Sequence, residues 1–91
     1  MVNKLIVAAS FTFAMSLSAQ AAPVEFCREY ATAAVNQVRA GLANPRCAAG
    51  VRGPRWTPNG DVHFQWCLRQ PVPMVESERG ARTAYLHACR G

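Results

Sequence analysis

Beyond residue 21 the sequence contains few of the side chains that enzymes use as nucleophiles or as general acids. Ser77 is the only serine, Asp61 is the only aspartate, and lysine does not occur. The other four acids fall in two close pairs that are typical of charges near a helix N-terminus. These are Glu25 with Glu29, and Glu76 with Glu78. Since so small a domain also has little room for a dry pocket, we expect no enzymatic activity and no catalytic residue.

The spacings that bind metal ions or haem are also missing. C-x-x-C, H-x-x-x-H and C-x-x-C-H do not occur, whereas structural zinc sites use ligands in close-spaced pairs. The best metal candidate is the run HFQWC at residues 63–67, because His63 and Cys67 would share one face of a helix. An oxidising compartment favours a disulfide at Cys67 instead, so we expect no bound metal and no cofactor.

A targeting segment is predicted at residues 1–21. Lys4 provides a positive charge, and an uncharged, mostly apolar run covers residues 5–19. Residues 19–21, AQA, have the small-x-small pattern that signal peptidase cleaves. No apolar run after this point is long enough to span a membrane, which takes roughly 20 residues. We expect residues 22–91 to form one small exported domain, in the periplasm or outside the cell.

All four cysteines lie in this predicted domain, at Cys27, Cys47, Cys67 and Cys89. An even number of cysteines in a short exported chain indicates disulfides. The size of the domain supports this, since a core of this size rarely provides more than roughly 3–5 kcal/mol on its own. We expect all four cysteines to be paired, which leaves no free thiol for catalysis.

The pattern of apolar residues predicts an all-α fold. Residues 23–42 carry one apolar stripe with spacings of three and four, as in an amphipathic helix. Residues 43–60 are rich in Gly, Pro and Asn, which predicts a long loop. A short helix is expected over residues 61–70, with Asp61 as its cap, and a last helix over residues 73–90.

Four cysteines allow three pairings, and the reach of the chain argues against one of them. Cys27 could bond Cys47 only if residues 41–47 ran back nearly straight along a helix that has advanced about 21 Å. Cys67 and Cys89 meet the same difficulty at the last helix. Two antiparallel helices would instead bring Cys27 to Cys89, so we favour nested pairing, Cys27–Cys89 with Cys47–Cys67. The crossed pairing, Cys27–Cys67 with Cys47–Cys89, stays open. The predicted fold is a small disulfide-stapled helical hairpin with a short third helix and a long central loop.

These features form a module that resembles small exported proteins of alphaproteobacteria. It reads C-x-x-Y-A…C…R-W…H-x-x-W-C…R…L-x-x-C and runs from Cys27 to Cys89. The resemblance covers most of residues 22–91 and implies the same stapled module. Those proteins have no established activity, so the resemblance implies no functional residue.

The charge of the predicted domain is positive, with nine arginines against five acids. Several arginines lie in or near the predicted loop, together with a tryptophan. These candidate binding residues are Arg46, Arg52, Arg55, Trp56 and Arg69. Because a guanidinium can hold a phosphate or a carboxylate through two parallel hydrogen bonds, we predict a non-enzymatic binding module. Its expected partner is an anionic glycan, a lipid headgroup or an acidic protein, and not nucleic acid.

Two other interpretations compete with this one. The chain could be a structural or regulatory envelope protein that docks on another protein by an apolar face. The loop could also be a plain solvated surface, with Trp56 turned inward to cover a disulfide. Under nested pairing, Trp66 is expected to cover the Cys47–Cys67 bond. Salt separates the two binding hypotheses, because contacts between exposed charges weaken as ionic strength rises.

Overall fold

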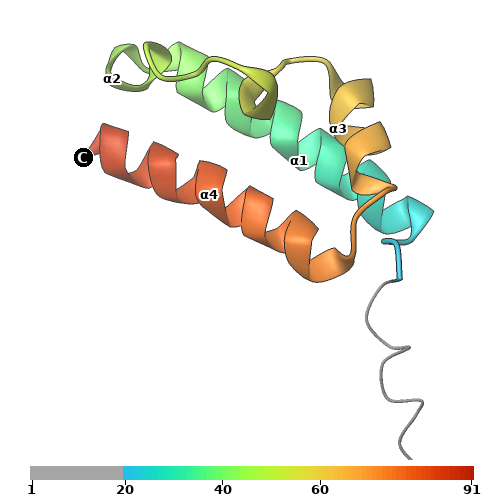
Figure 1. Cartoon of the computed structure of the whole chain (residues 1–91). Helices are drawn as coiled ribbons and strands as arrows, with labels where there is room; N and C mark the ends of the chain where they lie inside the picture. Colours follow the sequence, from blue (N-terminus) through green and yellow to red (C-terminus); the bar gives the residue numbers. More distant parts are fainter. Residues whose placement is uncertain (1–19) are drawn as a thin grey trace, which may run out of the picture.

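The computed structural model describes residues 20–91, so residues 1–19 and nearly all of the predicted targeting segment lie outside the described part of the chain. The described residues form four α-helices and one 3-10 helix, without a strand. In chain order these are α1 (Val24–Ala43), α2 (Pro45–Ala48), η2 (Pro54–Trp56), α3 (Gly60–Cys67) and α4 (Val72–Arg90) (Figure 1). The prediction of an all-α, disulfide-stapled fold is confirmed. Within residues 20–91, no helix is both long and apolar enough to cross a membrane.

Two asparagines define the starts of the short helices. Asn44 Oδ1 accepts a hydrogen bond from the Arg46 amide at 2.9 Å, at the start of α2. Asn59 Oδ1 accepts one from the Asp61 amide at 3.0 Å, at the start of α3. Such caps satisfy amides that have no partner within the helix. The cap of α3 is therefore Asn59 and not Asp61, and the expected long loop contains two short helical segments.

The helical hairpin is formed by α1 and α3. The Cys27–Cys67 disulfide joins the first turns of α1 to the end of α3. At the other end of this pair, Gly60 begins α3 and lies beside Val35 of α1. The two helices therefore run antiparallel, and the chain returns along α1 before the last helix begins.

The two long helices, α1 and α4, run parallel (Figure 1). Glu29 in α1 accepts a hydrogen bond from Arg79 in α4 at 2.9 Å. Further along both helices, Gln37 donates one to Thr83 at 3.0 Å. The expected antiparallel arrangement of the long helices is thus wrong, because α3 carries the chain back to the beginning of α1.

The direction of α4 also decides the disulfides, which are Cys27–Cys67 and Cys47–Cys89. Their Cα atoms are 5.6 Å and 5.2 Å apart. The favoured nested pairing, Cys27–Cys89 with Cys47–Cys67, is wrong, since parallel helices place Cys27 and Cys89 at opposite ends of the molecule. The sequential pairing, Cys27–Cys47 with Cys67–Cys89, which the reach of the chain argued against, does not form. None of the four cysteines is free.

Each disulfide lies in its own cluster of buried residues. The first cluster lies between the start of α1, the end of α3 and the start of α4, and contains Ala22, Cys27, Tyr30, Ala34, Cys67 and Val75. The second lies at the other end and contains Val38, Cys47, Val51, Trp56 and Leu86. Two small cores of this kind bury little apolar surface, so the fold depends on its disulfides.

Candidate functional site

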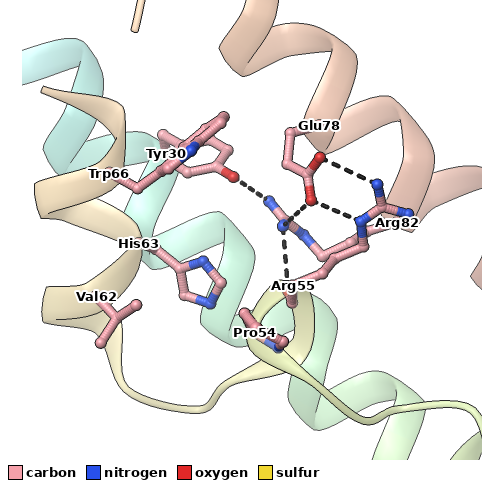
Figure 2. A pocket seen from close by; sticks show the side chains of 8 residues that line it. All are labelled: Tyr30, Pro54, Arg55, Val62, His63, Trp66, Glu78 and Arg82. Carbon is pink, nitrogen blue, oxygen red and sulfur yellow. Dashed lines mark hydrogen bonds and ion pairs between the residues drawn. The ribbon is translucent and has the colours of Figure 1, made fainter. Parts of the chain in front are cut away.

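A cavity of about 370 Å³ opens between η2, α3 and α4, above the ring of Tyr30 in α1. Figure 2 shows its lining, with residues of α3 on one side and Glu78 and two arginines on the other. The eight lining residues are Tyr30, Pro54, Arg55, Val62, His63, Trp66, Glu78 and Arg82. The sequence predicted only part of this set, because the lining comes from four separate segments.

Arg82 is fully buried and forms the polar floor of the cavity. Its Nη2 donates to the Tyr30 hydroxyl at 2.7 Å, and its Nε donates to Gln37 Oε1 at 2.8 Å. Its Nη1 donates to the Arg55 carbonyl at 3.3 Å. Glu78 provides the countercharge, with 3.7 Å between Arg82 Nη1 and Glu78 Oε2. Glu78 and Arg82 are four residues apart in α4, and these contacts leave Arg82 occupied by protein partners.

Arg55 is held at the rim of the cavity by the same glutamate. Its Nε and Nη2 donate to the two oxygens of Glu78 at 2.6 Å and 3.2 Å (Figure 2). This two-pronged contact is the strong form of an arginine–carboxylate pair, and it raises the pKa of Arg55 above its ordinary value. The Arg55 side chain remains 48% exposed. Its Nη1 donates no hydrogen bond within residues 20–91, so it can reach a ligand.

His63 provides an acceptor on the opposite wall. It is buried, and its Nε2 lies 2.8 Å from the Thr57 carbonyl, which can only accept. The proton of the neutral ring is therefore on Nε2, and Nδ1 is left with a lone pair. Burial lowers the pKa of His63 below its ordinary value, and the hydrogen bond to Thr57 opposes this only in part. His63 is thus a neutral acceptor at neutral pH.

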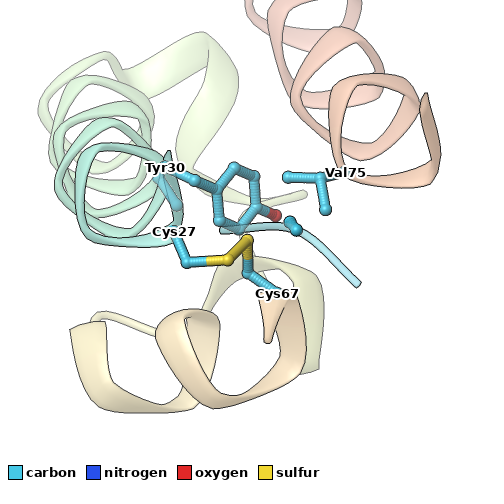
Figure 3. Packing of buried hydrophobic residues seen from close by; sticks show 6 residues of the cluster. Cys27, Tyr30, Cys67 and Val75 are labelled. Carbon is cyan, nitrogen blue, oxygen red and sulfur yellow. A yellow bond between two sulfur atoms is a disulfide. The ribbon is translucent and has the colours of Figure 1, made fainter. Parts of the chain in front are cut away.

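The apolar wall is built on the Cys27–Cys67 disulfide. Tyr30 packs between this disulfide and Val75 (Figure 3). The Tyr30 ring contacts Trp66 with 5.9 Å between ring centroids. The HFQWC run therefore has two roles. Cys67 fixes the end of α3 through its disulfide, and His63 and Trp66 line the cavity. Trp66 packs against the cluster that contains the Cys27–Cys67 disulfide, and the Cys47–Cys67 bond that it was expected to cover does not form.

In the structure, the arginines and the tryptophan of the predicted binding site do not lie together. Trp56 is 7% exposed and packs edge-on against Tyr85 in the second cluster, so it does not face solvent. Arg55 belongs to the cavity, and Arg69 follows α3 at the Cys27–Cys67 end of the molecule. Only Arg46 and Arg52 share the end that contains α2.

Arg46 and Arg52 are exposed, and each bonds a backbone carbonyl. Arg46 Nη1 donates to the carbonyl of Arg90, the last residue of α4, at 3.4 Å. Arg52 Nε donates to the Ala49 carbonyl at 2.9 Å. Each contact uses one of the five N–H groups of a guanidinium, so most donors of both side chains point to solvent.

The cavity itself was missed by sequence reasoning. The i, i+4 spacing of Glu78 and Arg82 is a sequence signal for an ion pair. No such signal connects this pair with Arg55, which comes from a distant segment. Tyr30 appeared only as one position of an apolar stripe. Comparison of the chain with family models, with curated proteins and with solved structures finds no match. Within residues 20–91, no group of three His, Cys, Asp or Glu side chains is placed to hold a metal ion.

Proposed function

We propose that the chain is an exported, non-enzymatic binding module that contacts an anionic partner through the exposed arginines around α2. The partner presents phosphate or carboxylate groups on an envelope glycan, a lipid headgroup or an acidic protein. The central residues are Arg46 and Arg52. Trp56 is not part of this surface, because it is buried in the second cluster.

This proposal rests on which arginines form ion pairs and which do not. Within residues 20–91, the ion pairs join four arginines to four glutamates: Arg28, Arg55, Arg79 and Arg82 with Glu25, Glu29, Glu76 and Glu78. The fifth acid, Asp61, lies in the first turn of α3. Arg46 and Arg52 have no acidic partner in the described chain, and a neighbouring arginine, Arg90, adds to their positive field. Clustered charge of one sign attracts a partner of the opposite sign.

Two observations support export. The fold carries two disulfides, which persist in oxidising compartments outside the cytosol. Ala22 is 5% exposed and its amide donates to the Gln70 carbonyl at 2.8 Å, whereas Ala21 is exposed. Cleavage after Ala21 would therefore keep every residue that packs into the first cluster.

The test is salt elution from a phosphocellulose resin. The Arg46→Ala/Arg52→Ala variant should elute at clearly lower salt than the wild type. The matched control is Arg28→Ala/Arg69→Ala, which removes the same charge from the Cys27–Cys67 end and should elute close to the wild type. Arg55 is left unchanged, because it lines the cavity beside Tyr30. Identical elution of the two variants would show that net charge alone governs retention and would overturn the proposed surface.

The rival hypothesis of an apolar docking face predicts a different salt response. Large exposed apolar side chains occur at Val24, Leu42, Val62 and Met74, on three different helices. A protein partner held by such residues would stay bound at high salt, because hydrophobic contacts are not screened. Binding that survives high salt and is unchanged in Arg46→Ala/Arg52→Ala would favour this rival.

A further inference from the structure

The cavity beside Tyr30 has the properties of a small-molecule site that is separate from the arginines around α2. Its volume of about 370 Å³ lies within the range of ligand pockets, roughly 300–1,000 Å³. Two of its apolar residues are not covered by the rest of the chain: Val62 is 46% exposed, and Trp66 is only partly buried. An apolar body entering the cavity would remove this surface from water.

The charges that line the cavity favour an anion. Arg55 and Arg82 contribute two positive charges, Glu78 contributes one negative charge, and His63 is neutral, so the lining is positive by one charge. Arg82 is occupied by Tyr30 and its other partners. Arg55, fixed by two hydrogen bonds and still half exposed, is therefore the group that can bind an incoming carboxylate.

The opposite wall of the cavity offers a hydrogen-bond acceptor, so it favours a ligand with a donor group. His63 Nε2 is engaged by Thr57, and Nδ1 makes no hydrogen bond within residues 20–91. No buried side-chain nitrogen or oxygen in this part of the chain lacks a partner, so Nδ1 is not sealed from solvent. A hydroxyl on the ligand can donate to it, which adds a polar contact to the aromatic one.

We propose that this cavity binds a small aromatic carboxylate that carries a ring hydroxyl. The carboxylate contacts Arg55, the ring packs on Trp66 and Val62, and the hydroxyl donates to His63. The proposal follows from the apolar wall, the positive lining and the acceptor at His63 Nδ1, and it does not depend on the surface around α2.

The test is a titration followed by NMR, with 4-hydroxyphenylacetate as the probe. The indole N–H signal of Trp66 should shift in a saturable way, while that of Trp56, which lies in the second cluster, should stay in place. The neutral amide and the amine analogue tyramine have the same ring and hydroxyl, and both should bind far more weakly. Absence of saturable shifts, equal binding of the amide, or shifts at Trp56 instead of Trp66 would each overturn the proposal.

A pair of variants at Val62 tests whether the probe binds in this cavity, and it leaves the core unchanged. Val62 is exposed near the start of α3, where an acidic side chain suits the helix dipole. Val62→Glu puts a negative charge on the wall where the ring packs, so it should bind the anionic probe about tenfold more weakly than Val62→Gln, which has the same size. Equal affinity of these two variants would contradict the assigned site. Arg46→Ala/Arg52→Ala should keep the wild-type affinity for the probe, which separates this proposal from the proposed function.

Discussion

Arg82 shows how a single buried charge can specify this small fold. Its guanidinium connects Tyr30 and Gln37 of α1 to the Arg55 carbonyl of η2 and to Glu78 of its own helix. A buried charge is tolerated only when its donors are satisfied, and this requirement fixes the register between α1 and α4. Within residues 20–91, no buried side-chain nitrogen or oxygen is left without a partner. Arg82 is thus a structural residue beneath the cavity, and Arg55 is the one that can bind.

His63 gives a prediction on pH. Its folded pKa lies below the ordinary value, first because the ring is buried, so the unfolded chain binds a proton that the folded chain does not. Stability should therefore be fully present above about pH 6.5 and should fall as the pH drops below it. In His63→Gln, whose amide can still donate to Thr57, this fall should be much smaller.

The measurement is the free energy of unfolding in urea at several pH values between about 5 and 7.5. His87→Gln is the matched control, because His87 is exposed on α4 and takes no part in this hydrogen bond. That variant should keep the wild-type slope. If wild type and His63→Gln lose stability in parallel, burial of His63 does not shape the pH response.

At the scale of elements, the sequence predicted the helices but not their directions. The spacing of apolar residues and the positions of helix-breaking residues predict helices at 23–42 and 73–90. Both predictions lie within a residue or two of α1 and α4. Periodicity carries no information on whether a helix runs parallel or antiparallel to another. That depended on the short helix α3, which returns along α1 and brings the chain back to the beginning of that helix. The disulfide pairing and the cavity both depend on this direction, so sequence reasoning missed both.

Two glycines in the long helices lead to opposite predictions. A Cβ at Gly80 in α4 would have nothing within 4 Å, so Gly80→Ala should stabilise the protein by about 0.5–1 kcal/mol through helix propensity. A Cβ at Gly41 in α1 would lie 2.7 Å from Val51 Cγ2 and 3.2 Å from Leu86 Cδ2. Overpacking of this kind typically costs about 1–3 kcal/mol, which exceeds the propensity gain, so Gly41→Ala should destabilise.

Urea unfolding of the two variants beside the wild type checks this pair. Both exchanges add the same methyl group to a helix, so propensity alone would shift them in the same direction. Stabilisation by Gly41→Ala would show that Val51 can move aside, and that α1 does not need a glycine where it contacts α4.

At the scale of the whole molecule, the two disulfides hold the two ends of the parallel helices. Each closes a long stretch, since the sequence separation is 40 for Cys27 and Cys67 and 42 for Cys47 and Cys89. By loop-closure entropy, each contributes about 4 kcal/mol to stability. Each disulfide also lies next to a candidate surface. Cys27–Cys67 supports Tyr30 and the cavity, whereas Cys47–Cys89 fixes α2, from which Arg46 projects.

One tryptic digest of the unreduced protein, expressed from the full sequence, tests this pairing and the predicted start of the mature chain together. Since arginines separate all four cysteines, the structure predicts residues 22–28 linked to residues 56–69, and residues 47–52 linked to residues 83–90. Mass spectrometry before and after reduction identifies each pair. Linkage of residues 22–28 to residues 83–90 would instead mean nested pairing and antiparallel long helices, and the cavity could not then form. The mass of the peptide that contains Cys27 also shows whether cleavage occurs after Ala21, because only then does that peptide begin at Ala22, the residue that the fold buries.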